Sequence, residues 1–109
     1  MANWVPRTGR VNVDVAGTEE QLTTTVTLVR EVTFVAPLAN AGNVFIGNSV
    51  ASAGTVSSTT GITLVPGQIM TITAPNFPGH GDERIDLSAF WFDAATNDDD
   101  IEFLYFIVG

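Results

Sequence analysis

The sequence predicts an all-β protein, a single antiparallel β-sandwich (jelly-roll or immunoglobulin-like) with about seven or eight strands and an N-terminal arm. Threonine and valine together make up 27 of the 109 residues, and β-branched side chains favour a pleated sheet over a helix. Ten glycines and five prolines divide the chain into short segments, several of which alternate apolar and polar residues. These features are typical of two packed sheets.

The chain is long enough for one domain only. A folded chain of 109 residues buries about 65% of the surface that it exposes when unfolded, which supports one modest core. Residues 1–10 hold half of the cations, a tryptophan and a proline without any alternation, so we expect an arm there. The β-sandwich domain is expected over residues 11–109.

Alternation and β-branched residues mark the strands of the first half. Val11, Val13 and Val15 alternate with polar residues, which predicts a short half-buried strand. Residues 22–36 predict one long strand with a bend near Arg30-Glu31, because such a run exceeds the usual strand length. A helix over residues 19–30 is disfavoured by three consecutive threonines. One face of the long strand is expected to carry the apolar residues Leu22, Val26, Leu28, Val32 and Phe34.

Turn signals separate the strands of the second half. Pro66-Gly67 places proline and glycine at the two central positions of a type II turn. The last strand is apolar on both faces, so it is either central in the sandwich or uses one face as an interface. Residues 48–61 predict a loop or a weak edge hairpin. Strands are expected at residues 44–47, 62–65, 68–74, 85–92 and 101–108, with loops at 37–42, 75–84 and 93–100.

The charge balance excludes several classes of partner. The chain has twelve acidic residues, four arginines and no lysine, which gives a formal net charge of -8. Nucleic-acid binding needs clustered lysine or arginine, and an anionic membrane would repel this chain, so we expect neither. Without cysteine there is no thiol catalysis and no disulfide. We see no signal peptide and no run of 18 apolar residues, so we expect synthesis in the cytoplasm without secretion.

Few residues offer chemistry. His80 is the one histidine, and it lies in a polar loop away from any Gly-x-Ser-x-Gly nucleophile elbow. We therefore expect no enzyme and no cofactor. Asp98, Asp99 and Asp100 are weak candidates for a divalent cation, since carboxylate oxygens bind calcium, although their spacing is not that of an EF-hand. The alternative is a solvated hairpin tip whose charges keep the following strand soluble.

Three sequence signals follow one another in the second half, ahead of the hydrophobic strand at the chain end. They are Asn43-Val44-Phe45-Ile46-Gly47-Asn48, then Gly61-Ile62-Thr63-Leu64-Val65-Pro66-Gly67-Gln68, then Asp86-Leu87-Ser88-Ala89-Phe90-Trp91-Phe92. This order resembles small virion proteins of tailed bacteriophages, in which a V-x-I-G strand, an I-x-L-x-P-G turn and a D-L-S-x-aromatic strand recur. The resemblance covers residues 43–108. It implies a β-sandwich in a phage particle, most like a capsid decoration (cement) protein, and no catalytic motif.

The expected function is that of a structural virion protein on the capsid surface. Its partner would be the major capsid protein, and we expect a homo-oligomer, either a trimer or a dimer. The alternative is a receptor- or glycan-binding module of a phage tail or fibre, which would need Trp91 or Phe77 as an exposed platform. An aromatic residue beside arginine suits an interface anchor, and the last strand has surplus apolar surface. The expected partner-binding residues are therefore Trp4, Val5, Arg7, Arg10, Tyr105 and Phe106.

Overall fold

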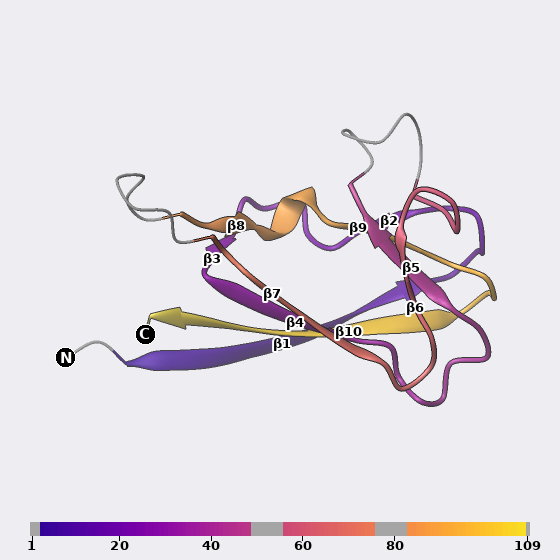
Figure 1. The fold of residues 1–109 in the computed structure, drawn as a ribbon, viewed down its shortest axis with the longest axis horizontal. Coiled ribbons are helices and arrows are strands. Elements are labelled where there is room, and N and C mark those ends of the chain that lie inside the picture. The colour runs from indigo at the N-terminus through magenta and orange to yellow at the C-terminus, as the bar shows by residue number, and fades with distance from the viewer. Residues whose placement is uncertain (1–2, 49–55, 76–82, 109) are drawn as a thin grey trace.

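The computed structural model describes residues 3–48, 56–75 and 83–108 and measures 44 × 29 × 22 Å. Within these ranges the fold is all-β, with two four-stranded antiparallel sheets and a separate pair of short strands (Figure 1). The predicted antiparallel sandwich is confirmed. The described residues form ten strands, near the predicted seven or eight.

The first sheet has the order β1–β10–β4–β7 and the second the order β2–β9–β5–β6. The strands of the first sheet are β1 (Trp4–Val13), β10 (Asp99–Val108), β4 (Glu31–Val35) and β7 (Ile69–Thr73). Those of the second are β2 (Glu20–Gln21), β9 (Trp91–Ala94), β5 (Val44–Gly47) and β6 (Ile62–Leu64). The short pair is β3 (Leu28–Val29) with β8 (Ile85–Asp86), and the 3-10 turn η1 (Leu87–Ala89) connects β8 to β9.

The core lies between the two sheets. Phe34 of β4 is fully buried, and its ring centroid lies 5.1 Å from that of Phe90 and 5.6 Å from that of Phe92. Such tilted and edge-on aromatic pairs are favourable beyond the apolar area they bury. Aliphatic side chains from both sheets complete the cluster, among them Val13, Val29, Val32, Val44, Leu64, Leu87 and Ile101.

Strand β10 is central in the first sheet, as one of the two sequence-based alternatives predicted. It pairs with β1 from Asp99 to Val108 and with β4 from Glu102 to Tyr105. Its odd-numbered side chains face the second sheet, where Ile101 is fully buried. Its even-numbered side chains therefore form the outer face of the first sheet.

Residues 4–10, which the sequence predicts to be an arm, are the first part of β1. Trp4 lies opposite Val108, and Arg10 lies opposite Glu102. The apolar alternation is missing because Arg7 and Gly9 occupy inward positions. At Gly9, the ring of Phe103 from β10 fills the space that a side chain would take.

The long strand expected over residues 22–36 is interrupted at Arg30, where the bend was predicted, and it begins later. Val26 and Leu28 are 67% and 59% exposed, so their predicted place on the apolar face beside Val32 was wrong. The threonines before them make local hydrogen bonds, such as Thr25 N–H to Thr23 Oγ1 at 3.2 Å. Bonds of this kind compete with sheet pairing.

The single strand expected over residues 85–92 is two strands separated by η1. The Asp86 carboxylate accepts hydrogen bonds from Ser88 N–H at 3.0 Å and from Ser88 Oγ at 2.8 Å. It also accepts one from Thr27 N–H at 3.4 Å. These bonds lower the pKa of Asp86, the Ser88 backbone bond contributing most, and they stabilise a cap that turns the chain out of the sheet.

The predicted turn at Pro66-Gly67 is present. Gln68 N–H donates to Val65 C=O at 3.0 Å, and Gly67 has φ +88°. Glycine adopts this left-handed conformation without the strain that a Cβ atom would cause.

Gly9 is covered by an aromatic ring from the neighbouring strand. Gly9 lies opposite Phe103 in the β1–β10 register, and a Cβ atom at position 9 would overlap the Phe103 ring. The Phe103 ring stacks on the Tyr105 ring, with 6.1 Å between the ring centroids and an interplanar angle of 15°. Glycine is therefore the residue that lets Phe103 cover β1.

We expect Gly9→Val to destabilise the protein, although valine is the better strand former. The valine would displace the Phe103 ring, and overpacking of this kind costs about 1–3 kcal/mol, more than the ~1 kcal/mol span of strand propensities. Urea denaturation measures the change. Thr8→Val, on the exposed outer face, is the control and should be neutral or mildly stabilising. Equal or greater stability of Gly9→Val would contradict the packing argument.

Candidate interaction surface

The ends of β1 and β10 extend beyond the rest of the first sheet. The pairing of β10 with β4 ends at Tyr105 opposite Val32, whereas its pairing with β1 continues to Val108 opposite Trp4. Residues 4–6 and 106–108 thus form a two-stranded projection, which we call the ribbon tip. Figure 1 shows it beside both chain ends.

Large apolar side chains are exposed on the ribbon tip. Trp4, Phe106 and Val108 are 56%, 44% and 57% exposed, and strand alternation places all three on the outer face of the first sheet. Trp4 and Phe106 line a pocket of about 300 Å³ together with Arg30 and Glu31. Exposed apolar side chains that lie together in this way commonly mark an interaction site.

Most of the predicted partner-binding residues lie at or next to this tip, but on two faces. Trp4 and Phe106 share the outer face, whereas Val5, Arg7 and Tyr105 occupy inward positions, with Arg7 opposite Tyr105. Alternation along two paired strands separates them. Arg30 and Glu31 were not among the predicted partner-binding residues. The feature of the sequence that marked them was the bend predicted at these two positions.

Arg10 lies away from the ribbon tip. Its guanidinium donates to Glu102 at 2.8 Å and to Asp100 at 3.4 Å. The bond to Glu102 and the charges of both carboxylates raise the pKa of Arg10. Arg10 thus forms an ion-pair network across β1 and β10, apart from the tip.

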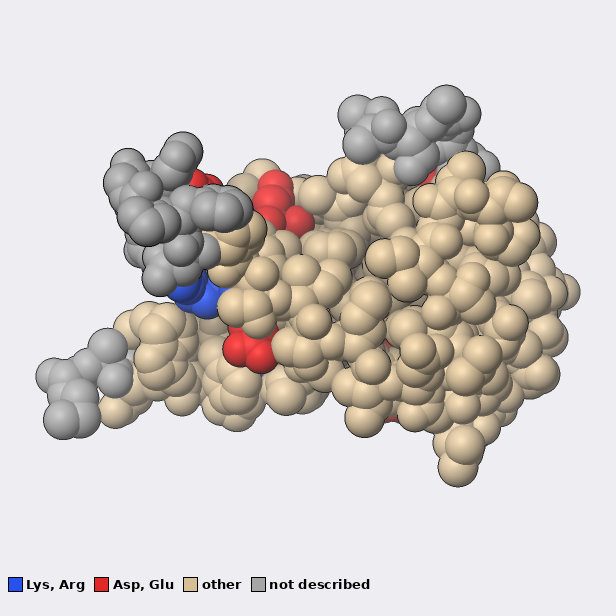
Figure 2. Space-filling view, viewed as in Figure 1, with Lys and Arg blue, Asp and Glu red and all other residues tan. Residues whose placement is uncertain are grey.

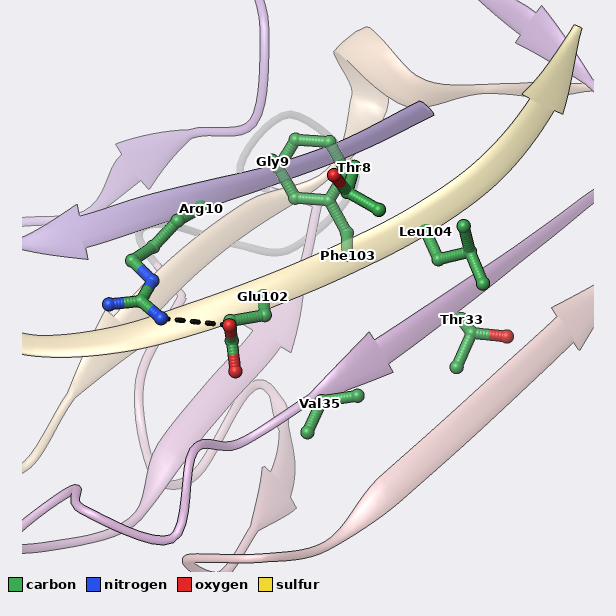
Figure 3. A pocket seen from close by; sticks show the side chains of 8 residues that line it. All are labelled: Thr8, Gly9, Arg10, Thr33, Val35, Glu102, Phe103 and Leu104. Carbon is green, nitrogen blue, oxygen red and sulfur yellow. Dashed lines mark hydrogen bonds and ion pairs between the residues drawn. The ribbon is translucent and has the colours of Figure 1, made fainter. Parts of the chain in front are cut away.

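A shallow second pocket of about 430 Å³ crosses the outer face of the first sheet (Figure 3). The Arg10–Glu102 ion pair lies at one end of it, and the view shows the Phe103 ring against the backbone of Gly9. Its other lining residues are Thr8, Thr33, Val35 and Leu104. Threonines and aliphatic side chains make this a contact surface suited to packing.

The three candidate metal-binding aspartates point to three different places. Asp99 is 5% exposed and accepts the backbone N–H groups of Ala41 and Gly42 at 2.9 Å each. Asp100 accepts the side chain of Asn12 at 2.7 Å as well as Arg10. Among the residues that the structure describes, no group of three or more histidine, cysteine, aspartate or glutamate side chains could hold a metal ion.

Asp98 forms a close carboxylate pair with Asp14. Its backbone has φ +65°, a left-handed conformation that aspartate and asparagine tolerate better than most residues. The hydrogen bond with Asp14 is the main cause of a raised pKa at Asp98, followed by partial desolvation and the charges of Asp14, Asp100 and Asp99. The hairpin tip is therefore exposed at Asp98, as predicted, but buried at Asp99.

Three further residues were candidates from the sequence: His80, Phe77 and Trp91. His80 and Phe77 lie outside the described residues. Trp91 is half-buried, and its neighbour Phe92 is fully buried in the core. No described helix has the length and apolar character needed to cross a membrane.

The two ends of the molecule carry different sets of charges. Arg7 lies beside the ribbon tip, Arg30 lines its pocket, and Arg84 precedes β8, which pairs with β3 next to Arg30. Carboxylates accompany these arginines, because Glu31 lines the same pocket and Glu83 precedes Arg84, and Figure 2 shows blue and red atoms together at this end of the visible face. The opposite end, where β1 ends and β10 begins, holds the carboxylates Asp14, Asp93, Asp98, Asp99 and Asp100.

Fold and surface together define a β-sandwich with an exposed apolar tip. Comparisons with protein-family models, with curated proteins and with solved structures found no match.

We expect Asp98→Asn to stabilise the protein at neutral pH. The raised pKa means that the folded state binds a proton at Asp98 more tightly than the unfolded chain does. The wild type is therefore favoured below the unfolded pKa of aspartate and loses that advantage as pH rises through the folded pKa. Asparagine removes the repulsion and keeps a hydrogen-bonding group.

Thermal unfolding at pH 7 and near pH 3.5 measures this effect. The gain in Tm should be clear at pH 7 and should shrink at the lower pH, where aspartate is largely protonated. Asp14→Asn is the matched variant, and the double variant should gain less than the sum of the two. An equal gain at both pH values would show that charge repulsion is not its cause.

Proposed function

We propose that this protein is a non-enzymatic structural component of a phage virion that binds the outside of the capsid and stabilises it. The observation that carries the proposal is the ribbon tip, where Trp4, Phe106 and Val108 are exposed together. The resemblance of residues 43–108 to small virion proteins supports the choice of a capsid as the target. The proposed partner is the major capsid protein.

The chemistry of the tip suits a protein interface. Tryptophan and arginine are enriched among the residues that contribute most to binding, and Arg30 lines the pocket together with Trp4. The side chains stand on paired strands, so less conformational freedom is lost on binding than with a loose loop. A surface of this kind can bind a partner without large rearrangement.

Capsid stabilisation follows from selective binding. A protein that binds the assembled shell and not its separated subunits shifts the equilibrium towards the shell. Because a capsid repeats the same surface many times, modest affinity per copy is enough for a large total effect. This mechanism requires only an interface.

We expect the protein to be present in hundreds of copies per particle, on the order of the number of capsid sites. Quantitative peptide mass spectrometry of purified virions from the source measures the number. A handful of copies would move the protein to the tail, and its absence from particles would discard the capsid proposal.

Substitutions at the tip should then reduce binding to capsids that lack the protein. We expect Trp4→Ala and Phe106→Ala each to weaken binding by about tenfold or more, the scale of an interface hot spot. Ile62→Ala is the matched control, because Ile62 is 58% exposed on β6 of the other sheet. Substitution is needed because deleting residues 2–10 would remove most of β1. Unchanged binding by both tip variants would refute the proposed surface.

A glycan-binding module of a tail or fibre is the second candidate. The pocket of about 300 Å³ favours it, because Trp4 and Phe106 offer apolar faces beside the charged groups of Arg30 and Glu31. An aromatic face can stack on the C–H face of a sugar while charged side chains bind its hydroxyls. Trp4 would replace Trp91 as the platform, since Trp91 is half-buried.

Glycan arrays and tryptophan fluorescence separate the two candidates. If the pocket binds glycans, a hit should quench fluorescence in the wild type and in Trp91→Phe, but not in Trp4→Phe. Binding that survives Trp4→Ala, or an array without hits, would leave the capsid proposal as the better one.

A further inference from the structure

Strand β1 has an open edge along its whole length. It has ten residues and pairs on one side with β10. Among the described residues, no strand pairs with its other side. An edge strand presents unpaired backbone N–H and C=O groups, which form a template for another strand.

The hydrogen bonds of β4 show which residues of β4 point towards β7. Ala36 N–H donates to Gln68 C=O at 2.9 Å, and Ala74 N–H donates to Arg30 C=O at 2.7 Å. Both pairs continue the β4–β7 register. The even-numbered residues of β4 therefore turn their backbone groups towards β7, and the odd-numbered ones towards β10.

The same alternation carries across the sheet to β1. Thr33 lies opposite Leu104 in the β4–β10 register, so the even-numbered residues of β10 bond to β4 and the odd-numbered ones to β1. Odd-numbered residues of β1 then bond to β10, since Gly9 lies opposite Phe103. The outward backbone groups are those of Trp4, Pro6, Thr8, Arg10 and Asn12.

The position of Pro6 agrees with this assignment. Proline has no N–H group, and within sheets it is tolerated on edge strands at positions that face away from the ladder. Pro6 thus leaves the bonds to β10 intact and removes a single donor from the open edge. Thr8, Arg10 and Asn12 retain outward donors and acceptors.

We propose that β1 pairs antiparallel with β1 of a second copy, centred on Thr8, so that the two first sheets become one continuous sheet. In this register Thr8 faces Thr8 of the other copy, Arg10 faces Pro6, and Asn12 faces Trp4. Nearly the whole strand is used. A centre at Arg10 would oppose two like charges, which destabilises a cross-strand pair.

The charges favour a second copy in this orientation. Arg7 and Arg10 lie within the paired part of β1, and the carboxylates of Asp14, Asp98 and Asp100 lie near its C-terminal end. Antiparallel pairing places the acidic end of each copy beside the N-terminal end of its partner's β1 and keeps the two acidic ends apart. Parallel pairing would bring the acidic ends together, at a cost from like-charge repulsion.

Strand β1 brings no acidic side chain into the interface. Trp4–Val13 contains two arginines and no acidic residue, in a chain with a formal net charge of -8. Pairing through β1 therefore limits like-charge repulsion between the two copies. This inference does not depend on capsid binding, because pairing uses the backbone groups of β1 and leaves the side chains of Trp4 and Phe106 on the outer face of the sheet.

Analytical ultracentrifugation of the full chain tests the dimer. We expect the wild type to show a monomer–dimer equilibrium, and Thr8→Pro to weaken dimerisation by at least about tenfold. Thr8→Pro removes one outward N–H and places a ring at the centre of the contact, without removing a bond to β10. Thr8→Ala keeps the N–H and should dimerise like the wild type, and thermal melts confirm that both variants are folded.

A cysteine variant provides a second test that needs no loss of stability. The chain has no cysteine, so Thr8→Cys introduces a single thiol at the proposed twofold axis. A short bis-maleimide should cross-link it into a covalent dimer. Thr63→Cys, exposed on β6 of the other sheet, should cross-link far less.

These experiments decide whether the edge of β1 is a dimer interface. A monomeric wild type at submillimolar concentration, or a trimer, would overturn the proposal. A dimer that persists unchanged in Thr8→Pro, with no preferential cross-link at position 8, would place the interface elsewhere and overturn it too. Neither result would alter the outcome of the capsid-binding assay on Trp4 and Phe106 variants.

Discussion

The pairing of β1 with β10 is the interaction on which the rest of the structure depends. It joins the two longest strands along ten register pairs. On the inner side it brings Phe103 over Gly9 and buries Ile101, which ties the pair to the core. Since β10 is the one strand that pairs with β1 among the described strands, the sheet hydrogen bonds of β1 depend on β10.

The start of β10 is fixed by the aspartates of the preceding hairpin. The Asp99 carboxylate accepts hydrogen bonds from two backbone N–H groups of the segment before β5. The backbone of Asp100 exchanges two hydrogen bonds with the side chain of Asn40. A buried carboxylate is stabilised by such charge-assisted bonds. Asp98 is the exception, because its proximity to Asp14 raises its pKa and opposes the folded state at neutral pH. The acidic end therefore combines structural bonds with residual repulsion.

Sequence reasoning reached the fold class because alternation and turn residues are local signals. The strand at residues 44–47 and the turn at Pro66-Gly67 depend on their own residues, and the structure contains both. Residues 4–10 of the first strand were missed because they depend on a distant partner. Gly9 looks like a break in a strand until Phe103 is placed over it. The break at Asp86 was missed although its shortest hydrogen bonds come from the nearby Ser88, because the apolar residues on both sides were interpreted as one strand.

The candidate surface was predictable in composition but not in arrangement. Trp4 and Phe106 are conspicuous in the sequence, yet their shared face follows from a register that no local pattern reveals. A bend was predicted at Arg30 and Glu31, but nothing local placed these residues beside the tip, where they lie next to the end of the β4–β10 pairing.

The alternation of odd- and even-numbered residues along β1 determines two properties of the surface. The even-numbered residues of β1 point their side chains to the outer face and, because of the bonding pattern in β4, their backbone groups to the open edge. A register slip of one residue would move Trp4 to the inner face and turn Pro6 towards β10, where its missing N–H would cost a ladder bond. The register that buries Val13 and Ile101 in the core is therefore the one that exposes the aromatic tip and leaves a nearly continuous edge. Core packing, rather than any separate feature of the surface, determines which side chains and backbone groups of β1 are exposed.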